Sequence, residues 1–175
     1  MRRLVLLPFL LLLLALAQVF PKEGGRYAYS DGTLQELLPT PEGFRLRYLK
    51  EGRVFREDRL KLTPEGLYLL GVGLPEGYFP FTPALLLYPP RLDLGLSWGG
   101  SARFRDQRVA LSARVEGLEG IKTRAGAFNA YRVRVAFTTE KGGTDLKELY
   151  LVPGLGVVAY RAGAGLVELL RFTAP

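Results

Sequence analysis

Carboxylates are the main candidates for acid–base chemistry in this sequence, because it contains no histidine and no cysteine. The absence of imidazole and thiol excludes Ser-His-Asp hydrolysis, thiolate nucleophiles and His-ligated zinc. Carboxylates close in sequence occur at Glu57-Asp58, at Glu116 with Glu119, and at Asp145 with Glu148. Residues one or three apart on a strand point to opposite faces, and the Glu116–Glu119 pair flanks the glycine of an expected turn. We therefore predict no catalytic residues and no enzyme. Carboxylates distant in sequence, as in a glycan hydrolase, and a Ser-Lys pair from separate strands stay open.

Oxygen-rich loops that could hold a metal ion are also scarce. The stretch Ser30-Asp31-Gly32-Thr33 is too short for a calcium loop and suits a β-turn better. We predict no metal site and no cofactor.

Aromatic side chains are plentiful, with ten Phe, nine Tyr and one Trp. They are typical either of an ordinary core or of an apolar groove for acyl chains or sugars. The segment 77–100 stands out because four prolines interrupt it, and proline is unsuited to a central strand. Its larger aromatic residues cannot all lie in a regular sheet core. We therefore predict ligand contacts near the mouth of the fold from Phe79, Phe81, Tyr88 and Trp98.

The rest of the chain alternates apolar and polar residues between regularly spaced turns. Turn signals recur about every eight to twelve residues, including three copies of Pro-Glu-Gly, which is typical of an antiparallel all-β fold. Tyr131, Val133 and Val135 are expected to face the core, whereas Arg132 and Arg134 face water. Strands are expected near 26–30, 33–38, 43–50, 53–62, 67–73, 102–116, 120–125, 129–139, 145–152, 156–161 and 165–173.

These elements predict one all-β domain over 18–175: a curved antiparallel sheet or half-barrel built from two meanders. The proline-rich segment at about 77–100 is expected to connect the two meanders and to pack its apolar residues over an open face. One departure from alternation occurs within 54–62, where Leu60 and Leu62 share a face with Arg56 and Asp58. It suggests that one end of this strand projects past the core.

The first seventeen residues have the three-part pattern of a secretory signal peptide, preceding the domain as a helix. Arg2 and Arg3 form a positive start, Leu4–Leu16 is an apolar run, and Ala15-Leu16-Ala17 is a small-x-small cleavage site. A mature N-terminus at Gln18 is predicted, and an uncleaved membrane anchor is the alternative. The apolar run is short for a membrane-spanning helix. We therefore expect an exported protein of the periplasm or cell envelope, touching the membrane only if the segment is kept.

The net charge of +7 comes from basic residues that alternate with apolar ones rather than cluster. Nucleic-acid binding needs a clustered basic patch, so we expect no nucleic-acid partner. The single Asn and three Gln are typical of a heat-adapted source.

Three stretches of the sequence carry a family resemblance. They read Ala-Gly-Ala-Phe-Asn-Ala-Tyr-Arg-Val at 125–133, Glu-Leu-Tyr at 148–150 and Pro-Gly-Leu-Gly-Val-Val at 153–158, and a proline-rich approach to Trp98 accompanies them. With these motifs the chain resembles a loose group of uncharacterised exported bacterial envelope proteins. The resemblance implies a curved antiparallel sheet akin to the folds of periplasmic lipoprotein carriers. Its motifs are turn and core residues, so it implies a fold and no activity.

The expected function is a non-enzymatic envelope protein that binds a lipid-like or other hydrophobic ligand. The alternatives are an interaction module of an envelope complex and, less favoured, the carboxylate-based glycan hydrolase. The identity of the ligand, the protein partners, the oligomeric state and the fate of the signal segment do not follow from the sequence.

Overall fold

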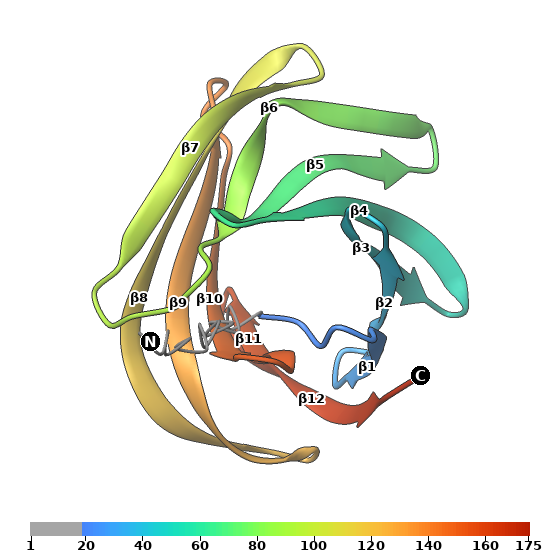
Figure 1. The fold of residues 1–175 in the computed structure, drawn as a ribbon, viewed down its shortest axis with the longest axis vertical. Coiled ribbons are helices and arrows are strands. Elements are labelled where there is room, and N and C mark those ends of the chain that lie inside the picture. The colour runs from blue at the N-terminus through green and yellow to red at the C-terminus, as the bar shows by residue number, and fades with distance from the viewer. Residues whose placement is uncertain (1–18) are drawn as a thin grey trace, which may run out of the picture.

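The computed structural model, which describes residues 19–175, is a closed antiparallel β-barrel in which each strand pairs with the next in sequence (Figure 1). Its strands are β1 (Gly25–Tyr29), β2 (Leu34–Thr40), β3 (Gly43–Lys50), β4 (Arg53–Thr63), β5 (Gly66–Leu74), β6 (Gly77–Tyr88), β7 (Ser97–Phe104), β8 (Gln107–Thr123), β9 (Gly126–Thr139), β10 (Thr144–Val152), β11 (Gly156–Ala162) and β12 (Gly165–Thr173). Within 19–175 there is no helix long and apolar enough to cross a membrane. The expected signal segment 1–17 and its cleavage before Gln18 lie outside the described residues.

The expectation of an all-β antiparallel domain is confirmed, but the half-barrel of two meanders is wrong. β12 pairs with β1 through partners such as Tyr27 and Phe172, and this pairing closes the sheet on itself. Alternation along a strand reveals which face is buried but not whether the first and last strands find each other. Closure satisfies the backbone groups that two free edges would leave unpaired.

The predicted connector at 77–100 is also wrong over most of its length. β6 covers 77–88 and β7 begins at Ser97, so only residues 89–96 join two strands. Pro80 and Pro83 lie inside β6, which pairs with β5 along most of its length. On its other side β6 has only two register pairs with β7, and a strand with so little pairing tolerates prolines, which lack an N–H donor.

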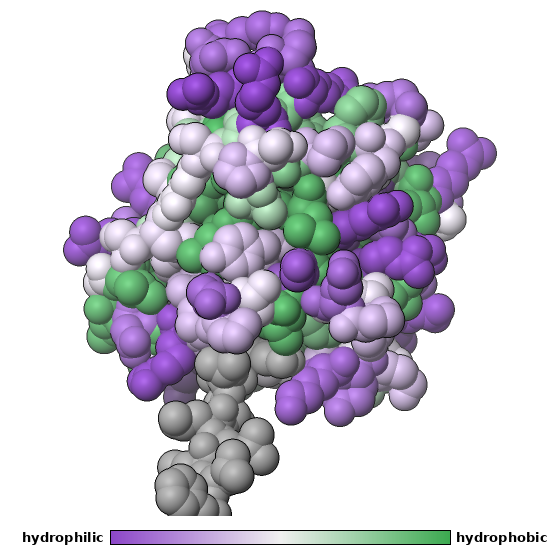
Figure 2. Space-filling view, turned by 45° about the horizontal axis from the view of Figure 1, so that its top comes forward, coloured by the Kyte–Doolittle hydropathy of each residue, from purple (hydrophilic) through white to green (hydrophobic). Residues whose placement is uncertain are grey.

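The apolar face of each strand points into the barrel, as the alternation predicts. Val133 is fully buried, Tyr131 and Val135 pack against the same core, and Arg134 is exposed. The inward side chains of all twelve strands contribute to one hydrophobic cluster. The outer surface is mixed: Figure 2 shows green hydrophobic patches separated by purple charged and polar side chains.

Two ends of the barrel can be distinguished by their turns. The N-terminal end carries the turns at 41–42 and 64–65, the 89–96 connector and the segment before β1. The opposite end, which we call the far end, carries the turns at 51–52 and 105–106, among others.

The segment before β1 plugs the N-terminal end of the barrel. Val19 and Phe20 are 7% and 5% exposed and belong to the core cluster. The ring of Phe20 meets the rings of Phe44 and Tyr88 edge-on, with centroids 6.3 and 6.2 Å apart. Gly156 leaves room for it: a Cβ at this position would lie 2.9 Å from Cδ1 of Phe20. No sequence pattern predicted this plug.

The β8–β9 hairpin is the longest in the barrel, and its tip extends to β12 (Figure 1). The backbone N–H of Ala125 donates to the carbonyl oxygen of Leu169 at 3.2 Å, and Arg124 lies 3.9 Å from Glu168. A β-bulge between Val115 and Gly117 shifts the register of the hairpin. Bulges bend a strand and increase its twist, which lets the hairpin curve around the barrel.

Candidate ligand-binding site

The four aromatic residues predicted to contact a ligand all lie on β6 or β7, beside the boundary between these two strands, which we call the β6–β7 seam. Phe79, Phe81 and Tyr88 belong to β6 and Trp98 belongs to β7. They do not gather at a single mouth, because they divide between the two ends of this seam.

At the far end, the group contains Phe79 and Phe81. Phe81 stacks on Phe104 of β7 with ring centroids 4.5 Å apart, and Phe79 meets Phe104 edge-on. The guanidinium of Arg105 lies 3.9 Å from the centre of the Phe79 ring, and it pairs with Glu76. The hydrogen bond from Arg105 lowers the pKa of Glu76. These contacts join the β5–β6 and β7–β8 turns over the seam.

At the N-terminal end, the group contains Tyr88 and Trp98. Tyr88 is buried against Phe20, and its burial raises the pKa of its hydroxyl well above the ordinary value. The indole Nε1 of Trp98 donates a hydrogen bond of 3.0 Å to the carbonyl oxygen of Leu87. A side chain therefore ties β7 to β6 at this end.

Along the whole seam between β6 and β7 there is little backbone pairing. β6 and β7 share two register pairs, Phe81 with Phe104 and Thr82 with Arg103, whereas every other neighbouring pair of strands has at least four. The prolines of β6 lack the N–H groups that a regular ladder requires. The β6–β7 seam is thus the part of the wall with the least backbone pairing.

An ion pair lies inside the barrel among apolar side chains. Arg56 and Asp58 project inward from β4, and Asp58 is only 3% exposed. Nε of Arg56 donates to Oδ1 of Asp58 at 2.6 Å, and Nη2 donates to Oδ2 at 3.1 Å. The hydroxyl of Tyr48, on β3, donates to the same Oδ2 at 3.1 Å. The carboxylate is therefore held by three hydrogen bonds.

This interior cluster corrects one interpretation of the sequence. The shared face of Arg56, Asp58, Leu60 and Leu62 suggested a strand end projecting past the core. The start of β4 at residues 53–55 is exposed, as expected, but Asp58 is buried opposite Leu46 and Val72, its register partners on β3 and β5. The signal that could have found the site was the charge itself, placed on the apolar face of an alternating strand.

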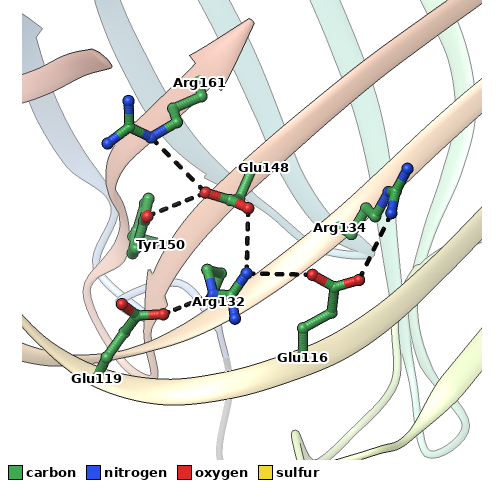
Figure 3. Close-up of polar contacts among 7 residues, drawn as sticks. All are labelled: Glu116, Glu119, Arg132, Arg134, Glu148, Tyr150 and Arg161. Atoms are coloured by element: carbon green, nitrogen blue, oxygen red, sulfur yellow. Dashed lines mark hydrogen bonds and ion pairs between the residues drawn. The ribbon is translucent and has the colours of Figure 1, made fainter.

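A second polar cluster covers the outer face of β8–β11 (Figure 3). Arg132 is its centre: Nε lies 2.6 Å from Glu119, and Nη1 lies 3.2 Å from Glu116 and 3.3 Å from Glu148. The carboxylates hold the pKa of Arg132 above its ordinary value. Arg134 also approaches Glu116, Arg161 approaches Glu148, and the Tyr150 hydroxyl donates to Glu148.

The outer cluster is balanced in charge and ties four strands together at the β8 bulge. Glu116 and Glu119 lie within β8, so the predicted turn at this point is a bulge instead. The guanidinium of Arg132 stands between the carboxylates of Glu116 and Glu148. General acid–base chemistry on a glycosidic bond needs two carboxyls flanking a substrate, and here an arginine occupies that space. The arrangement suits a cross-strand clamp.

A shallow groove of about 250 Å³ lies at the N-terminal end of the barrel. Its walls come from Lys22, from residues 39–44 and from Leu62. Phe44 lines this groove and also contacts Phe20. The groove is thus the outer side of the plugged end.

Comparisons with known proteins give two distant structural likenesses. No protein-family model matches the chain, and no curated protein matches its sequence. A solved structure of a candidate lipoprotein from Parabacteroides distasonis aligns with a TM-score of 0.46 and 12% identity, covering 89% of this chain and 98% of the other. The hypothetical lipoprotein YmcC from Escherichia coli aligns with a TM-score of 0.44 and 14% identity, covering 90% of this chain and 89% of the other. Likenesses this distant assign no function, which must come from the residues of the chain itself.

Proposed function

We propose that this chain is a non-enzymatic protein of the cell envelope whose barrel holds a hydrophobic, lipid-like ligand. The observation that carries the proposal is an apolar barrel interior whose wall is weakly paired along one seam, between β6 and β7. The interior supplies a binding surface, and the seam supplies a route to it.

The number of strands supports an interior that can accept a guest. Barrel diameter grows with strand number, and eight strands already give an interior just wide enough for side chains to fill or to hold one small ligand. This barrel has twelve strands and fills its centre with large rings, including Tyr27, Tyr29 and Phe44, together with the Phe20 plug. A hydrophobic ligand would replace contacts of this kind.

The seam supports lateral entry. Opening a strand pair costs least where the fewest backbone hydrogen bonds must break. The two aromatic groups at its ends would contact an entering apolar chain. Phe79 and Phe81 would do so from the far end, and Tyr88 and Trp98 from the N-terminal end.

An envelope location rests on the pattern of the first seventeen residues, with a positive start, an apolar run and a small-x-small site. A non-enzymatic role is supported by the carboxylates of the two polar clusters, which are already held by ion pairs and hydrogen bonds. Glu116, Glu119 and Glu148 are engaged by Arg132, and Asp58 is engaged by Arg56 and Tyr48.

A second candidate function, an interaction module of an envelope complex, is favoured by an apolar row on the outer surface. Leu34 of β2 and Val54 of β4 are 45% and 49% exposed, and both are register partners of Leu49 on β3. A partner protein could cover this row. The row is short, and for this reason the ligand-binding role is preferred.

The test is ligand capture by delipidated protein. We expect saturable binding of a fluorescent acyl probe, together with acyl lipids co-purifying with protein that was never delipidated. Ala102 is buried in the interior on β7 and Ala127 is exposed, so Ala102→Trp should lower probe binding and the matched Ala127→Trp should not. Absence of both probe binding and bound lipid would overturn the proposal and favour the interaction module.

A further inference from the structure

The interior ion pair is an unusual feature of an otherwise apolar wall. Asp58 lies between Leu46 and Val72, and the next inward residue along β4 is Leu60, which is buried. Taking a charge such as that of Asp58 out of water costs more than its pairing commonly returns, and an apolar side chain of similar size is often at least as stable. The charges therefore call for a role besides stability.

After the hydrogen bonds within the cluster are made, only Arg56 has N–H donors left over. The three bonds from Arg56 and Tyr48 engage both oxygens of Asp58. A guanidinium has five N–H donors, and Arg56 uses two of them on Asp58. Among the described residues, Nη1 of Arg56 makes no hydrogen bond. Arg56 thus retains free donors while Asp58 is fully engaged.

The solvent exposure of Arg56 and Asp58 indicates whether the free donors of Arg56 are accessible. The side chain of Arg56 is 39% exposed and that of Asp58 is 5% exposed. Burial lowers the pKa of Arg56, but the charge of Asp58 outweighs this effect, so that the pKa lies above its ordinary value. Tyr48 flanks it, with the Arg56 guanidinium carbon 5.2 Å from the ring centre. A cation held by Asp58 therefore stands at the far end of the interior, partly exposed to solvent, with Asp145 of β10 as a further carboxylate in its electrostatic surroundings.

We propose that Arg56 binds the anionic head group of an amphiphile whose apolar tail lies along the barrel interior toward Phe20. This inference rests on the proposed ligand-binding function and adds the head-group class and the orientation. Oxygens of a carboxylate or a phosphate match the fork of guanidinium N–H donors. Asp58 and Tyr48 act as positioning residues that orient the guanidinium.

The wall below Arg56 suits an acyl tail. From Arg56 to Leu62 β4 spans roughly 20 Å, and the inward residues along it include Leu60 and Leu62. Phe44 and Tyr88 follow at the N-terminal end, where Phe20 closes the barrel. An anionic head at the far end and a tail against these side chains would match the polarity of the interior.

The experiment compares three ligands with the same tail: dodecanoate, dodecyl phosphate and dodecanol. Their affinities are measured by calorimetry on delipidated wild-type protein, on Arg56→Gln and Tyr48→Phe, and on the exposed control Arg53→Gln. We expect the wild type to prefer an anionic ligand over dodecanol by about tenfold or more, because charge-assisted hydrogen bonds are worth more than neutral ones. Whichever of dodecanoate and dodecyl phosphate binds more tightly identifies the head group.

The variants separate head-group recognition from tail binding. Arg56→Gln should abolish the preference and leave dodecanol affinity unchanged, Tyr48→Phe should reduce the preference, and Arg53→Gln should keep it. Equal wild-type affinity for the anions and dodecanol would overturn the head-group inference and leave the ligand-binding function standing. Failure of all three ligands to bind would overturn the proposed function itself. If Arg56→Gln does not fold, the affinities of the wild type for the two anionic ligands and for dodecanol decide whether the head-group inference holds.

Discussion

The indole Nε1 of Trp98 donates a hydrogen bond to the carbonyl oxygen of Leu87. Among the described residues, β6 and β7 have no backbone register pair at this position. A side chain thus replaces backbone pairing at the N-terminal end of the seam. The two register pairs lie at the other end, at Phe81 and Thr82. The seam is therefore fastened at two separated points, and its middle depends on neither a ladder nor a turn.

Trp98→Phe should loosen the seam without disturbing the rest of the barrel. The substitution keeps an aromatic ring but removes the donor, which is worth about 1 kcal/mol. Backbone amides of 97–101 should exchange with deuterium faster, while amides of 107–115 on β8 should exchange as before. Unchanged exchange on β7 would show that the Trp98 hydrogen bond does not hold the seam.

Phe20→Ala should strongly destabilise the barrel, because it empties the plug at the N-terminal end. Loss of a buried phenylalanine costs about 3–5 kcal/mol. Leu94 is 64% exposed and provides the control: Leu94→Ala should change the free energy of unfolding in urea by less than about 0.5 kcal/mol. Equal effects of the two substitutions would mean that the plug does not contribute to the core.

Gly156→Ala tests the same contact from the other side. Gly156 has φ of 105°, which side chains rarely adopt, and a Cβ would press on the ring of Phe20. We expect a loss of more than about 1 kcal/mol from strain. Combining it with Phe20→Ala should cost less than the sum of the two, because the clash disappears with the ring. Strict additivity in this double-mutant cycle would argue against the contact.

Alkaline pH should unfold the barrel through its tyrosines. Burial raises the pKa of Tyr27, Tyr29, Tyr48, Tyr88 and Tyr160 above the ordinary value of 10.0. Above pH 10 the unfolded chain releases tyrosine protons that the folded chain keeps, so stability falls as pH rises and is fully present below pH 10. Tyrosinate absorbance should appear together with loss of β-sheet circular dichroism. Ionisation of these hydroxyls near pH 10 in a folded barrel would contradict the burial.

Arg132→Met should have a small effect that depends on salt. Its ion pairs with Glu116, Glu119 and Glu148 are partly exposed, and exposed pairs contribute less than about 1 kcal/mol each. The three carboxylates left behind repel one another, so the loss of stability should shrink when salt is added. A large loss that salt does not change would show that Arg132 acts through packing instead of charge.

The strand pattern was largely predictable from the sequence, because alternation and turn residues act locally. The strand expected at 43–50 coincides with β3, and β1 differs from its expected bounds by one residue at each end. The errors in the expected strand boundaries also have local causes. The β7–β8 turn at Arg105-Asp106 contains neither glycine nor proline, and Arg105 adopts a positive φ of 55° without them. Gly117 looked like a turn residue but belongs to a bulge.

The long-range features could not be predicted, because they depend on which distant segments meet. Closure of the barrel through β1 and β12, and the burial of Phe20 against Gly156, join opposite ends of the chain. The four aromatic residues near the prolines lie beside one seam, but their separation along it was not foreseen. The Arg56–Asp58 pair was visible in the sequence and misinterpreted.

The location of Trp98 allows a direct measurement of ligand binding in the barrel, because it is the only tryptophan of the chain and packs against the core. A brominated acyl chain quenches tryptophan fluorescence only at close range. We predict saturable quenching of Trp98 by a bromododecanoate, reversed by excess dodecanoate and absent with bromide salt. No quenching up to the solubility limit of the probe, with the protein folded and delipidated, would contradict a lipid-like ligand in this barrel.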